Sequence, residues 1–215
     1  QWLAAPEPER FDAWQKAAGG GIRILTLAPE AEGAPRLIRH VVRQGGAVSL
    51  GHHLADDDAI ARAVDAGATL CTHLGNGIAN LLPRHPNPVW TQLAEDRLTA
   101  CVIADGHHLP ASVLRVIWRT KGRERFVVTS DSAAIAGLPA GPYDYMGSPV
   151  EIEPGGRIVV RRADTADTGA GVTLAGSSST MADCLRHLAT LGDWSEDDLV
   201  QVGRRNPARV LGVRL

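Results

Sequence analysis

Short apolar runs alternate with amphipathic segments through the first 130 residues of the chain. The apolar runs predict buried strands at 22–27, 47–50, 68–71, 98–104 and 126–130. Between them, apolar residues recur at helical spacing and predict helices at 6–17, 34–44, 56–66, 89–95 and 110–119. Strands that alternate with helices form a parallel sheet covered by helices, so the predicted fold class is α/β. A TIM-type barrel needs eight such units, and the five found here leave three missing.

The pattern changes after Asp131. Short apolar runs separated by turn residues predict antiparallel strands at 143–146, 150–152 and 157–161. A connection without regular structure is expected at 164–171, followed by a helix that is capped by Ser177 or Ser178 and ends near residue 191. Ser195 and Asp198 have the spacing of a capping box and predict the start of the next helix.

Polar residues with metal and proton chemistry stand where the predicted parallel strands end. His52, His73 and His108 follow three of these strands, and Asp131 follows a fourth. Because the carboxyl ends of parallel strands meet at one edge, we expect these side chains to open onto one face. Neutral imidazole suits zinc or iron, and a metal-bound water could lose its proton to Asp131. A lone histidine at a strand end is more often a hydrogen-bonded structural residue, and spacing alone also allows Glu30 as a carboxylate ligand.

Composition narrows the class of partner. The chain of 215 residues is 44% hydrophobic, so it can bury a sizeable core. A net charge of −2 without clustered Lys or Arg argues against nucleic acid and favours a small-molecule partner. Three cysteines without close pairing and no long apolar span predict a cytoplasmic protein that does not enter a membrane. The first residue is Gln1 rather than an initiator Met, and we expect the natural protein to be longer at both ends.

Several motifs occur in an order that resembles one family, the N-acetylglucosamine-6-phosphate deacetylases of the amidohydrolase superfamily. The resemblance covers nearly the whole chain, and the joint order of its motifs is more specific than any one of them. The motifs are Thr26-Leu27-Ala28-Pro29-Glu30, Gly51-His52, Thr72-His73-Leu74 with Asn76, Arg84-His85-Pro86, Ile103-Ala104-Asp105-Gly106 with His108, Thr129 to Asp131, Leu174-Ala175-Gly176-Ser177, and Asn206-Pro207-Ala208-Arg209.

The resemblance implies a (β/α)8 barrel of the TIM type with a small β-sandwich. Residues 1–215 would be a partial metal-dependent hydrolase domain that covers strands four to eight and the C-terminal helices. The N-terminal strands and most of the sandwich would be missing. In this family two further metal-binding histidines and a glutamate precede the region that matches this chain, so Glu30 is withdrawn as a direct ligand and kept as a group that supports the site.

The resemblance also implies an activity and a role for each matched residue. The activity is hydrolysis of the N-acetyl group of N-acetylglucosamine 6-phosphate, an amino sugar phosphate, with zinc or alternatively iron as the divalent metal. His52 and His73 would bind the metal, and Asp131 would be the catalytic acid and base. The substrate would contact His108, and Arg84 would bind its phosphate from a neighbouring subunit, which implies a homodimer. Other matched residues would line the substrate site: Asn76 and Gly77 through their backbone, and Leu174, Ala175 and Gly176 as the floor of the pocket.

The loop after His73 departs from the family pattern. It has Gly75, Gly77 and Ile78 where an aromatic residue, Ala and Met are usual, and this would reshape the pocket beside the phosphate. A different N-acyl or cyclic amide substrate is therefore one alternative. Another alternative is a non-catalytic, truncated homologue, because two histidines without the upstream ligands should bind metal poorly. His53 and His107 are interpreted as hydrogen-bonded loop residues.

Overall fold

A computed structural model describes residues 4–79, 81–160 and 173–215 of the chain, and its larger part is built on a five-stranded parallel sheet. The strand order follows the chain, and neighbouring strands pair in parallel register. The strands are β1 (Ile24–Leu27), β2 (Ala47–Leu50), β3 (Leu70–Cys71), β4 (Thr99–Ile103) and β5 (Phe126–Thr129). All five strands predicted from the apolar runs are confirmed, with shorter bounds for most of them.

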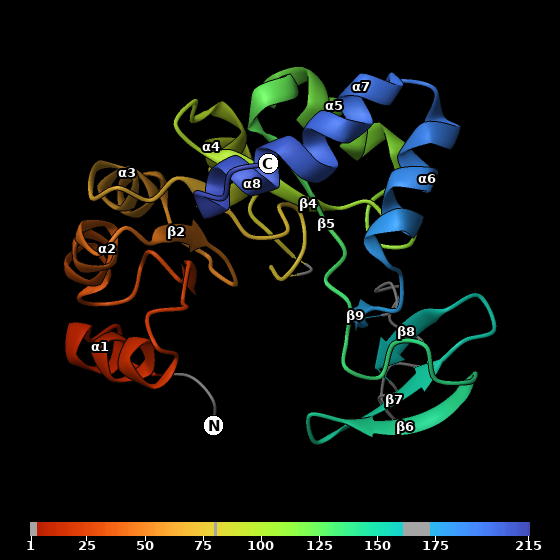
Figure 1. The fold of residues 1–215 in the computed structure, drawn as a ribbon, viewed down its shortest axis with the longest axis horizontal. Coiled ribbons are helices and arrows are strands. Elements are labelled where there is room, and N and C mark those ends of the chain that lie inside the picture. Colours follow the sequence, from red (N-terminus) through yellow and green to blue (C-terminus); the bar gives the residue numbers. More distant parts are fainter. Residues whose placement is uncertain (1–3, 80, 161–172) are drawn as a thin grey trace.

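Helices form an arc outside this sheet in the order of the chain (Figure 1). They are α1 (Pro8–Ala17), α2 (Ala34–Arg43), α3 (Asp57–Asp65), α4 (Pro88–Ala94) and α5 (Ala111–Lys121), with the short 3-10 turn η1 (Arg123–Arg125) before β5. Apolar residues at helical spacing face inward, so Leu37, Ile38 and Val41 of α2 are buried together with Phe11 of α1. The predicted alternation of strand and helix is therefore confirmed as an α/β arrangement.

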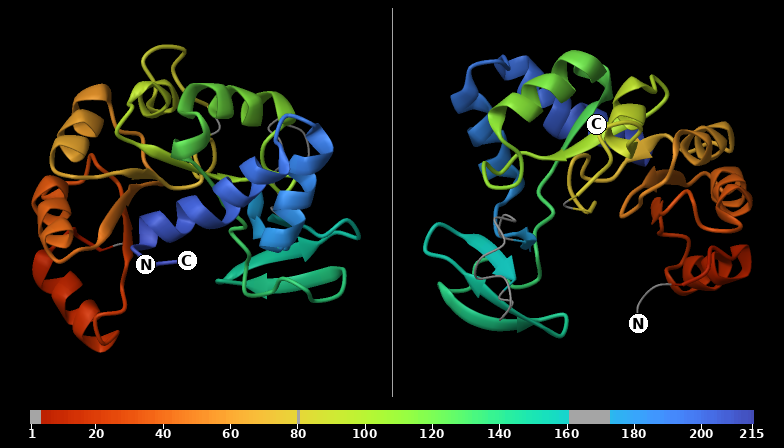
Figure 2. Two further views of the ribbon diagram at one scale, coloured as in Figure 1. Left: turned by 45° about the horizontal axis from the view of Figure 1, so that its top comes forward. Right: turned by 180° about the vertical axis from the view of Figure 1, so that it is seen from behind.

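The second sheet has four antiparallel strands and lies to one side of the parallel sheet (Figures 1 and 2). Its strands are β6 (Gly141–Tyr145), β7 (Ser148–Ile152), β8 (Arg157–Val160) and β9 (Leu174–Ser177). Val150, Ile152 and Ile158 form its own small core. The three strands predicted here are confirmed, whereas β9 was not predicted as a strand. The connection expected at 164–171 lies outside the described residues.

The chain ends in helices that return to the parallel sheet. These are α6 (Met181–Leu191), α7 (Glu196–Val200), the π-helical segment η2 (Gln201–Arg205) and α8 (Asn206–Leu211). The predicted capping box of Ser195 and Asp198 is confirmed at α7. The cap predicted for α6 is wrong, because Thr180 closes a capping box with Asp183 while Ser177 belongs to β9.

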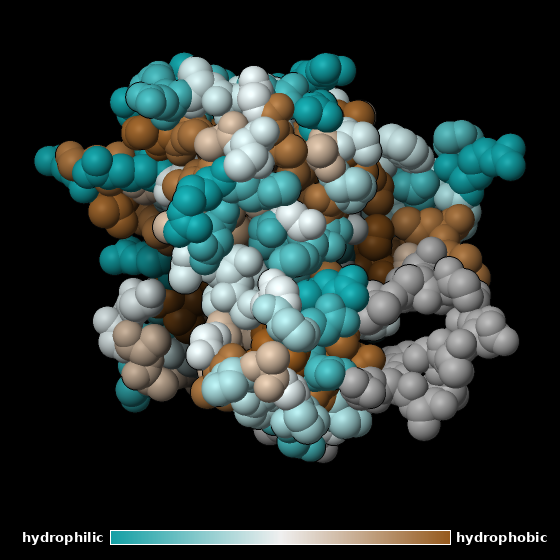
Figure 3. Space-filling model, turned by 90° about the vertical axis from the view of Figure 1, so that its right-hand side faces the viewer, coloured by the Kyte–Doolittle hydropathy of each residue, from teal (hydrophilic) through white to brown (hydrophobic). Residues whose placement is uncertain are grey.

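The surface on the side of α6 and the antiparallel sheet is mixed in character where its residues are described. Seen from there, hydrophilic and hydrophobic residues are mixed (Figure 3). Within residues 4–79, 81–160 and 173–215, no helix is long and apolar enough to cross a membrane.

Candidate active site

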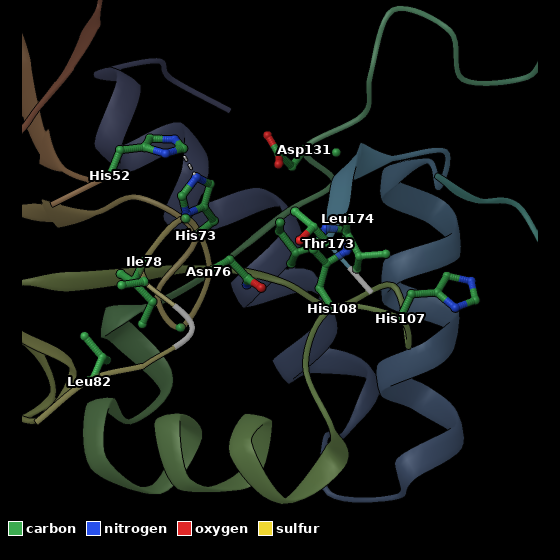
Figure 4. A pocket seen from close by; sticks show the side chains of 15 residues that line it. His52, His73, Asn76, Ile78, Leu82, His107, His108, Asp131, Thr173 and Leu174 are labelled. Carbon is green, nitrogen blue, oxygen red and sulfur yellow. Dashed lines mark hydrogen bonds between the residues drawn. The ribbon is translucent and has the colours of Figure 1, made fainter. Parts of the chain in front are cut away.

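A cavity of about 610 Å³ opens at the carboxyl ends of the parallel strands. His52 lies two residues after the end of β2, His73 two residues after the end of β3, and Asp131 two residues after the end of β5. All three line this cavity (Figure 4). The parallel register pairs Leu50 with Cys71, so the loops after β2 and β3 start at the same level. The sequence-based expectation that these residues share one face is confirmed.

The same three residues have a strained backbone. Their φ angles are 55° at His52, 30° at His73 and 49° at Asp131, and Met146 is the one further non-glycine residue with positive φ in the described part of the chain. A bulky residue with positive φ costs on the order of 1–3 kcal/mol and persists where the surrounding structure imposes it. The residues with this backbone strain are therefore the candidate metal ligands and the candidate proton carrier, whose side chains line the cavity.

The two imidazole rings converge on a common point. Nε2 of His52 and Nε2 of His73 are 3.0 Å apart, and the rings stand at 87° to each other. Two nitrogen atoms bound to one zinc ion at about 2.0–2.1 Å would lie slightly farther apart than this. Because the rings meet through their Nε2 atoms, the pair resembles two ligands of one metal ion more than a structural ring stack.

Burial favours the neutral form of His73, which is the form that binds a metal. The pKa of His73 is lowered, first by burial and then by the charge of His52, while Asp131 acts in the opposite direction. Nδ1 of His73 is buried and has no hydrogen-bond partner among the described residues. No group of three or more His, Cys, Asp or Glu side chains in the described parts of the chain could hold a metal ion. The residues present therefore fit two positions of a metal site and leave the other ligands to be supplied.

The loop after His73 lies directly against the two rings. A Cβ atom added at Gly77 would be 2.5 Å from Cε1 of His73 and 2.9 Å from Cε1 of His52, so only glycine fits there in this arrangement. The neighbouring Asn76 points toward the cavity, and its Nδ2 atom is buried without a hydrogen-bond partner in the described residues (Figure 4). Asn76 thus has a hydrogen-bond donor that no described residue uses.

The structure brings most of the other predicted residues to the cavity, although not all. Leu174, Gly176 and His108 line it, while Ala175 and Arg84 are not among the lining residues. Arg84 is exposed in the loop before α4. Glu30 is not among the residues that line the cavity; its Oε1 accepts a hydrogen bond from the backbone nitrogen of Leu54 at 2.9 Å, in the loop that carries His52.

Sequence reasoning missed several residues of the cavity wall. Apolar lining residues such as Ala79 and Leu82 carry no chemical signal that distinguishes them from core residues. His107 lines the wall but was interpreted as a loop residue, and nothing in its spacing shows otherwise. His53 is buried at 4% exposure and its Nδ1 accepts a hydrogen bond from the backbone nitrogen of Ala55, as expected for a loop residue.

Comparison with known proteins gives a consistent result. No family model matches the chain. The chain is 34% identical over 213 residues to N-acetylglucosamine-6-phosphate deacetylase of Bacillus subtilis, which covers 99% of this chain and 51% of that protein. It is 35% identical over 192 residues to N-acetylgalactosamine-6-phosphate deacetylase of Escherichia coli O157:H7, covering 89% of this chain and 48% of that protein.

A solved structure agrees with the sequence relatives. It is a substituted N-acetyl-D-glucosamine-6-phosphate deacetylase from Mycobacterium smegmatis in complex with N-acetyl-D-glucosamine-6-phosphate. Its TM-score is 0.83 at 32% identity, and the match covers 98% of this chain and 54% of that one.

Fold, site and relatives together define the class. The chain is an α/β protein whose candidate catalytic residues lie at the carboxyl ends of parallel strands. Active sites of TIM-barrel enzymes lie at the same end of their strands. The chain is similar over nearly its whole length to N-acetylglucosamine-6-phosphate deacetylases, which agrees with the resemblance inferred from its motifs. The chain spans about half the length of the curated relatives that it matches.

Proposed function

We propose that the protein hydrolyses the N-acetyl group of N-acetylglucosamine 6-phosphate, giving glucosamine 6-phosphate and acetate. The observation that carries this proposal is the convergence of His52 and His73 through Nε2 atoms 3.0 Å apart, in a cavity that Asp131 also lines. Relatives with this name match almost the whole chain, and one neighbour was solved with this substrate bound. The reaction consumes one water molecule and transfers its proton and hydroxide to the amine and the acyl group.

A divalent metal ion is part of the proposal, with zinc as the first choice and iron as the alternative. Two neutral imidazoles suit either ion, and His52 and His73 would hold it together with ligands from outside the described residues. Such an ion would polarise the acetyl carbonyl and lower the pKa of a water molecule to about 7.

Asp131 is the proposed proton carrier. Its exposed carboxylate stands on the cavity wall, and its backbone oxygen accepts a hydrogen bond from the backbone nitrogen of Ser177 at 2.9 Å. The carboxylate would take a proton from the attacking water and later deliver it to the leaving nitrogen. His108 and the free Nδ2 donor of Asn76 would contact the amino sugar, and Leu174, Ala175 and Gly176 would form the floor below it.

The phosphate and the neighbouring subunit form a separate part of the proposal. Arg84 is exposed and lies outside the cavity lining, in a loop whose Leu81 is 91% exposed. A guanidinium group can bond two phosphate oxygens at once. We infer a homodimer in which this loop reaches the other subunit and Arg84 binds the phosphate there, as the resemblance implies.

The proposed architecture is a complete (β/α)8 barrel. The edges of β1 and β5 are unpaired within the described residues, and such open edges are normally paired or covered. Residues 1–215 would then be a partial hydrolase domain, with the strands that close the barrel and most of the β-sandwich contributed by other segments. The three free cysteines fit the proposed cytoplasmic location.

The decisive test is acetate release from N-acetylglucosamine 6-phosphate by the longest natural form of the protein, with bound metal measured in the same sample. The proposal expects acetate release and about one metal ion or more per site, with release lost in Asp131→Asn while the metal stays bound. Asp58→Asn, an exposed change in α3, is the matched control and should keep the activity. Metal without acetate release would contradict the substrate, and absence of both would favour the non-catalytic alternative.

A second candidate substrate is N-acetylgalactosamine 6-phosphate. A relative with that specificity in its name is 35% identical to this chain, and Gly75 and Gly77 alter the loop beside the cavity. The two sugars differ in the configuration of one hydroxyl group, so a direct comparison of kcat/KM on both decides between them. A different, non-phosphorylated amide would be favoured if Arg84→Ala left the activity unchanged.

A further inference from the structure

The carboxyl end of β4 carries a residue that the proposed function leaves without a role. Asp105 lies two residues after the last residue of its strand, the same position that His52, His73 and Asp131 occupy after theirs. Unlike them, Asp105 does not line the cavity. It is buried behind the wall, and only 1% of its side chain is exposed.

Asp105 accepts four hydrogen bonds. Its Oδ1 accepts from the backbone nitrogen atoms of His107 and His108, each at 2.9 Å. Its Oδ2 accepts from Nδ1 of His108 at 2.8 Å and from the hydroxyl group of Ser177 at 3.0 Å. The two bonds to Oδ1 fix the backbone of His107 and His108. The bond from Nδ1 to Oδ2 fixes the ring of His108, which lines the cavity.

The carboxylate determines where the proton of His108 lies. Burial alone would raise the pKa of Asp105, but the hydrogen bonds from the His108 side chain and from the backbone of both histidines outweigh it and leave the pKa well below its usual range. An ionised carboxylate only accepts hydrogen bonds, so Nδ1 of His108 must carry a proton. In the neutral ring, Nε2 then has a free lone pair and is the nitrogen available to a ligand in the cavity.

Ser177 links this pair to the other side of the site. The residue is 3% exposed, and its hydroxyl group donates to Asp105 while accepting from the backbone nitrogen of Ser179 at 2.9 Å. Its own backbone nitrogen donates to the backbone oxygen of Asp131 at 2.9 Å. Thus one residue of β9 contacts both the partner of His108 and the loop of the proposed proton carrier. Thr173 and Leu174, which precede it in the chain, lie beside His108 in the cavity wall (Figure 4).

We propose that Asp105, held by Ser177, is a positioning residue that fixes His108 as the Nδ1–H tautomer, so that its Nε2 accepts a hydrogen bond from a substrate hydroxyl group. The tautomer follows from the hydrogen bonds to the ionised Asp105 and does not depend on the proposed function. The nature of the bound hydroxyl group rests on the proposed function, since an amino sugar presents such donors to the cavity.

Asp105→Asn separates this role from a merely structural one. The amide oxygen can still accept the two backbone hydrogen bonds and keep the loop, whereas its NH2 group faces Nδ1 of His108. Two donors cannot face each other, so the ring proton should move to Nε2. Ser177→Ala removes one donor to the carboxylate but leaves its charge, and should keep the tautomer.

The direct measurement is nitrogen-15 NMR of the histidine rings in the full protein, above the pH at which the imidazole titrates. His108→Gln assigns the signal. We expect the Nδ1–H tautomer in the wild type and the Nε2–H tautomer in Asp105→Asn. The matched control is Asp12→Asn, which breaks an exposed contact of 2.7 Å between Asp12 and His40 and should leave the His108 signal unchanged. A wild-type ring protonated at Nε2, or an unchanged tautomer in Asp105→Asn, overturns the proposal.

Kinetics test the substrate contact separately. Loss of one hydrogen-bond acceptor should raise KM about tenfold in Asp105→Asn and change kcat less, because the contact is made equally in ground and transition states. Ser177→Ala should raise KM about twofold or less, since the ring keeps its tautomer. A moved proton with unchanged KM would overturn the proposal that the substrate needs an acceptor at Nε2, because a hydroxyl group can also accept a hydrogen bond from Nε2–H. If the wild type released no acetate from any amino sugar phosphate, the proposed function would fail, while the NMR result would still decide the tautomer.

Discussion

The two ends of the parallel sheet differ in backbone strain and in the hydrogen bonding of their buried polar groups. At the carboxyl end, His52, His73 and Asp131 have positive φ angles, and buried donors of the cavity wall lack partners among the described residues. At the amino end, the buried side chains of Lys121 and Asn206 are hydrogen-bonded, although Nε of Arg125 has no partner among the described residues. Nζ of Lys121 donates to the backbone oxygens of Gln92 and Glu95 at 2.6 and 2.7 Å.

Asn206, which contacts the first residue of β5, is a second buried side chain at this end whose nitrogen and oxygen are both hydrogen-bonded. It is completely buried, and its Nδ2 donates to the backbone oxygens of Arg123 and Phe126, both at 2.8 Å, while its Oδ1 accepts from Gln201. Satisfied buried hydrogen bonds stabilise a fold, whereas strain and unpaired donors destabilise it. The comparison indicates that the hydrogen bonds of Lys121 and Asn206 stabilise the amino end, whereas the strained residues of the carboxyl end line the candidate site.

The largest expected effect of a single change is on activity at the carboxyl end. Asp131→Asn keeps the shape of the side chain and suits the positive φ, but it removes the proposed proton carrier. We expect kcat to fall about 10³-fold while the free energy of unfolding stays equal or rises. Acetate release and denaturant unfolding measure the two quantities. A variant that keeps its activity, or that loses it together with its fold, would break the contrast between the two ends.

At the amino end the effect should fall on stability instead. Asn206→Ala removes the donor to the buried backbone oxygen of Phe126 and to the half-buried one of Arg123, at a cost of about 3 kcal/mol, or roughly 150-fold in the unfolding equilibrium. The activity per folded molecule should change less than about twofold, because no atom of the site moves. Denaturant unfolding of the full protein measures the loss.

Asn87→Ala is the matched control for that experiment. Asn87 caps α4 by accepting a hydrogen bond from the backbone nitrogen of Val89 at 3.1 Å, at a partly exposed position. Its loss should cost about 1 kcal/mol. Equal losses at positions 87 and 206 would show that burial of the two oxygens does not set the difference.

A smaller effect is expected where the glycine loop touches the rings. Gly77→Ala places a methyl group within 2.5 Å of His73, so one or both imidazoles must move. Metal affinity should fall about 10-fold or more, because ligands need positions held to about 0.5 Å. Metal titration measures this fall. Gly137→Ala introduces an alanine at a φ of 85° with no atom within 4 Å, and so tests backbone strain alone. Similar metal affinity in both variants would show that the rings tolerate the methyl group.

The sequence predicted the parallel sheet because each of its strands is a continuous apolar run next to a helix of clear period. His52, His73 and Asp131 were found by the same logic, since each follows such a run. Strand β9 escaped prediction because Leu174-Ala175-Gly176-Ser177 is short and small, and Ser177 was interpreted as a helix cap. Its hydrogen bond to Asp105 spans 72 residues, and no local pattern encodes a contact of that kind. The positive φ angles were hidden too, because histidine and aspartate occupy ordinary regions elsewhere.

The smallest effect is expected at the three cysteines, of which Cys71 is the last residue of β3. Burial raises the pKa of Cys71 and Cys101 to about 12 and that of Cys184 to about 11, so thiolate is scarce near pH 8. We expect a thiol reagent to label the folded protein about 10³-fold more slowly than a free thiol, and all three positions to react after unfolding. The folded protein should also keep its acetate release during labelling, since none of these sulfur atoms lines the cavity of His52 and His73. Fast labelling that stops acetate release would show that a reactive thiol lies in the site. The reactive groups of the site would then not be limited to the strained residues at the carboxyl end of the sheet.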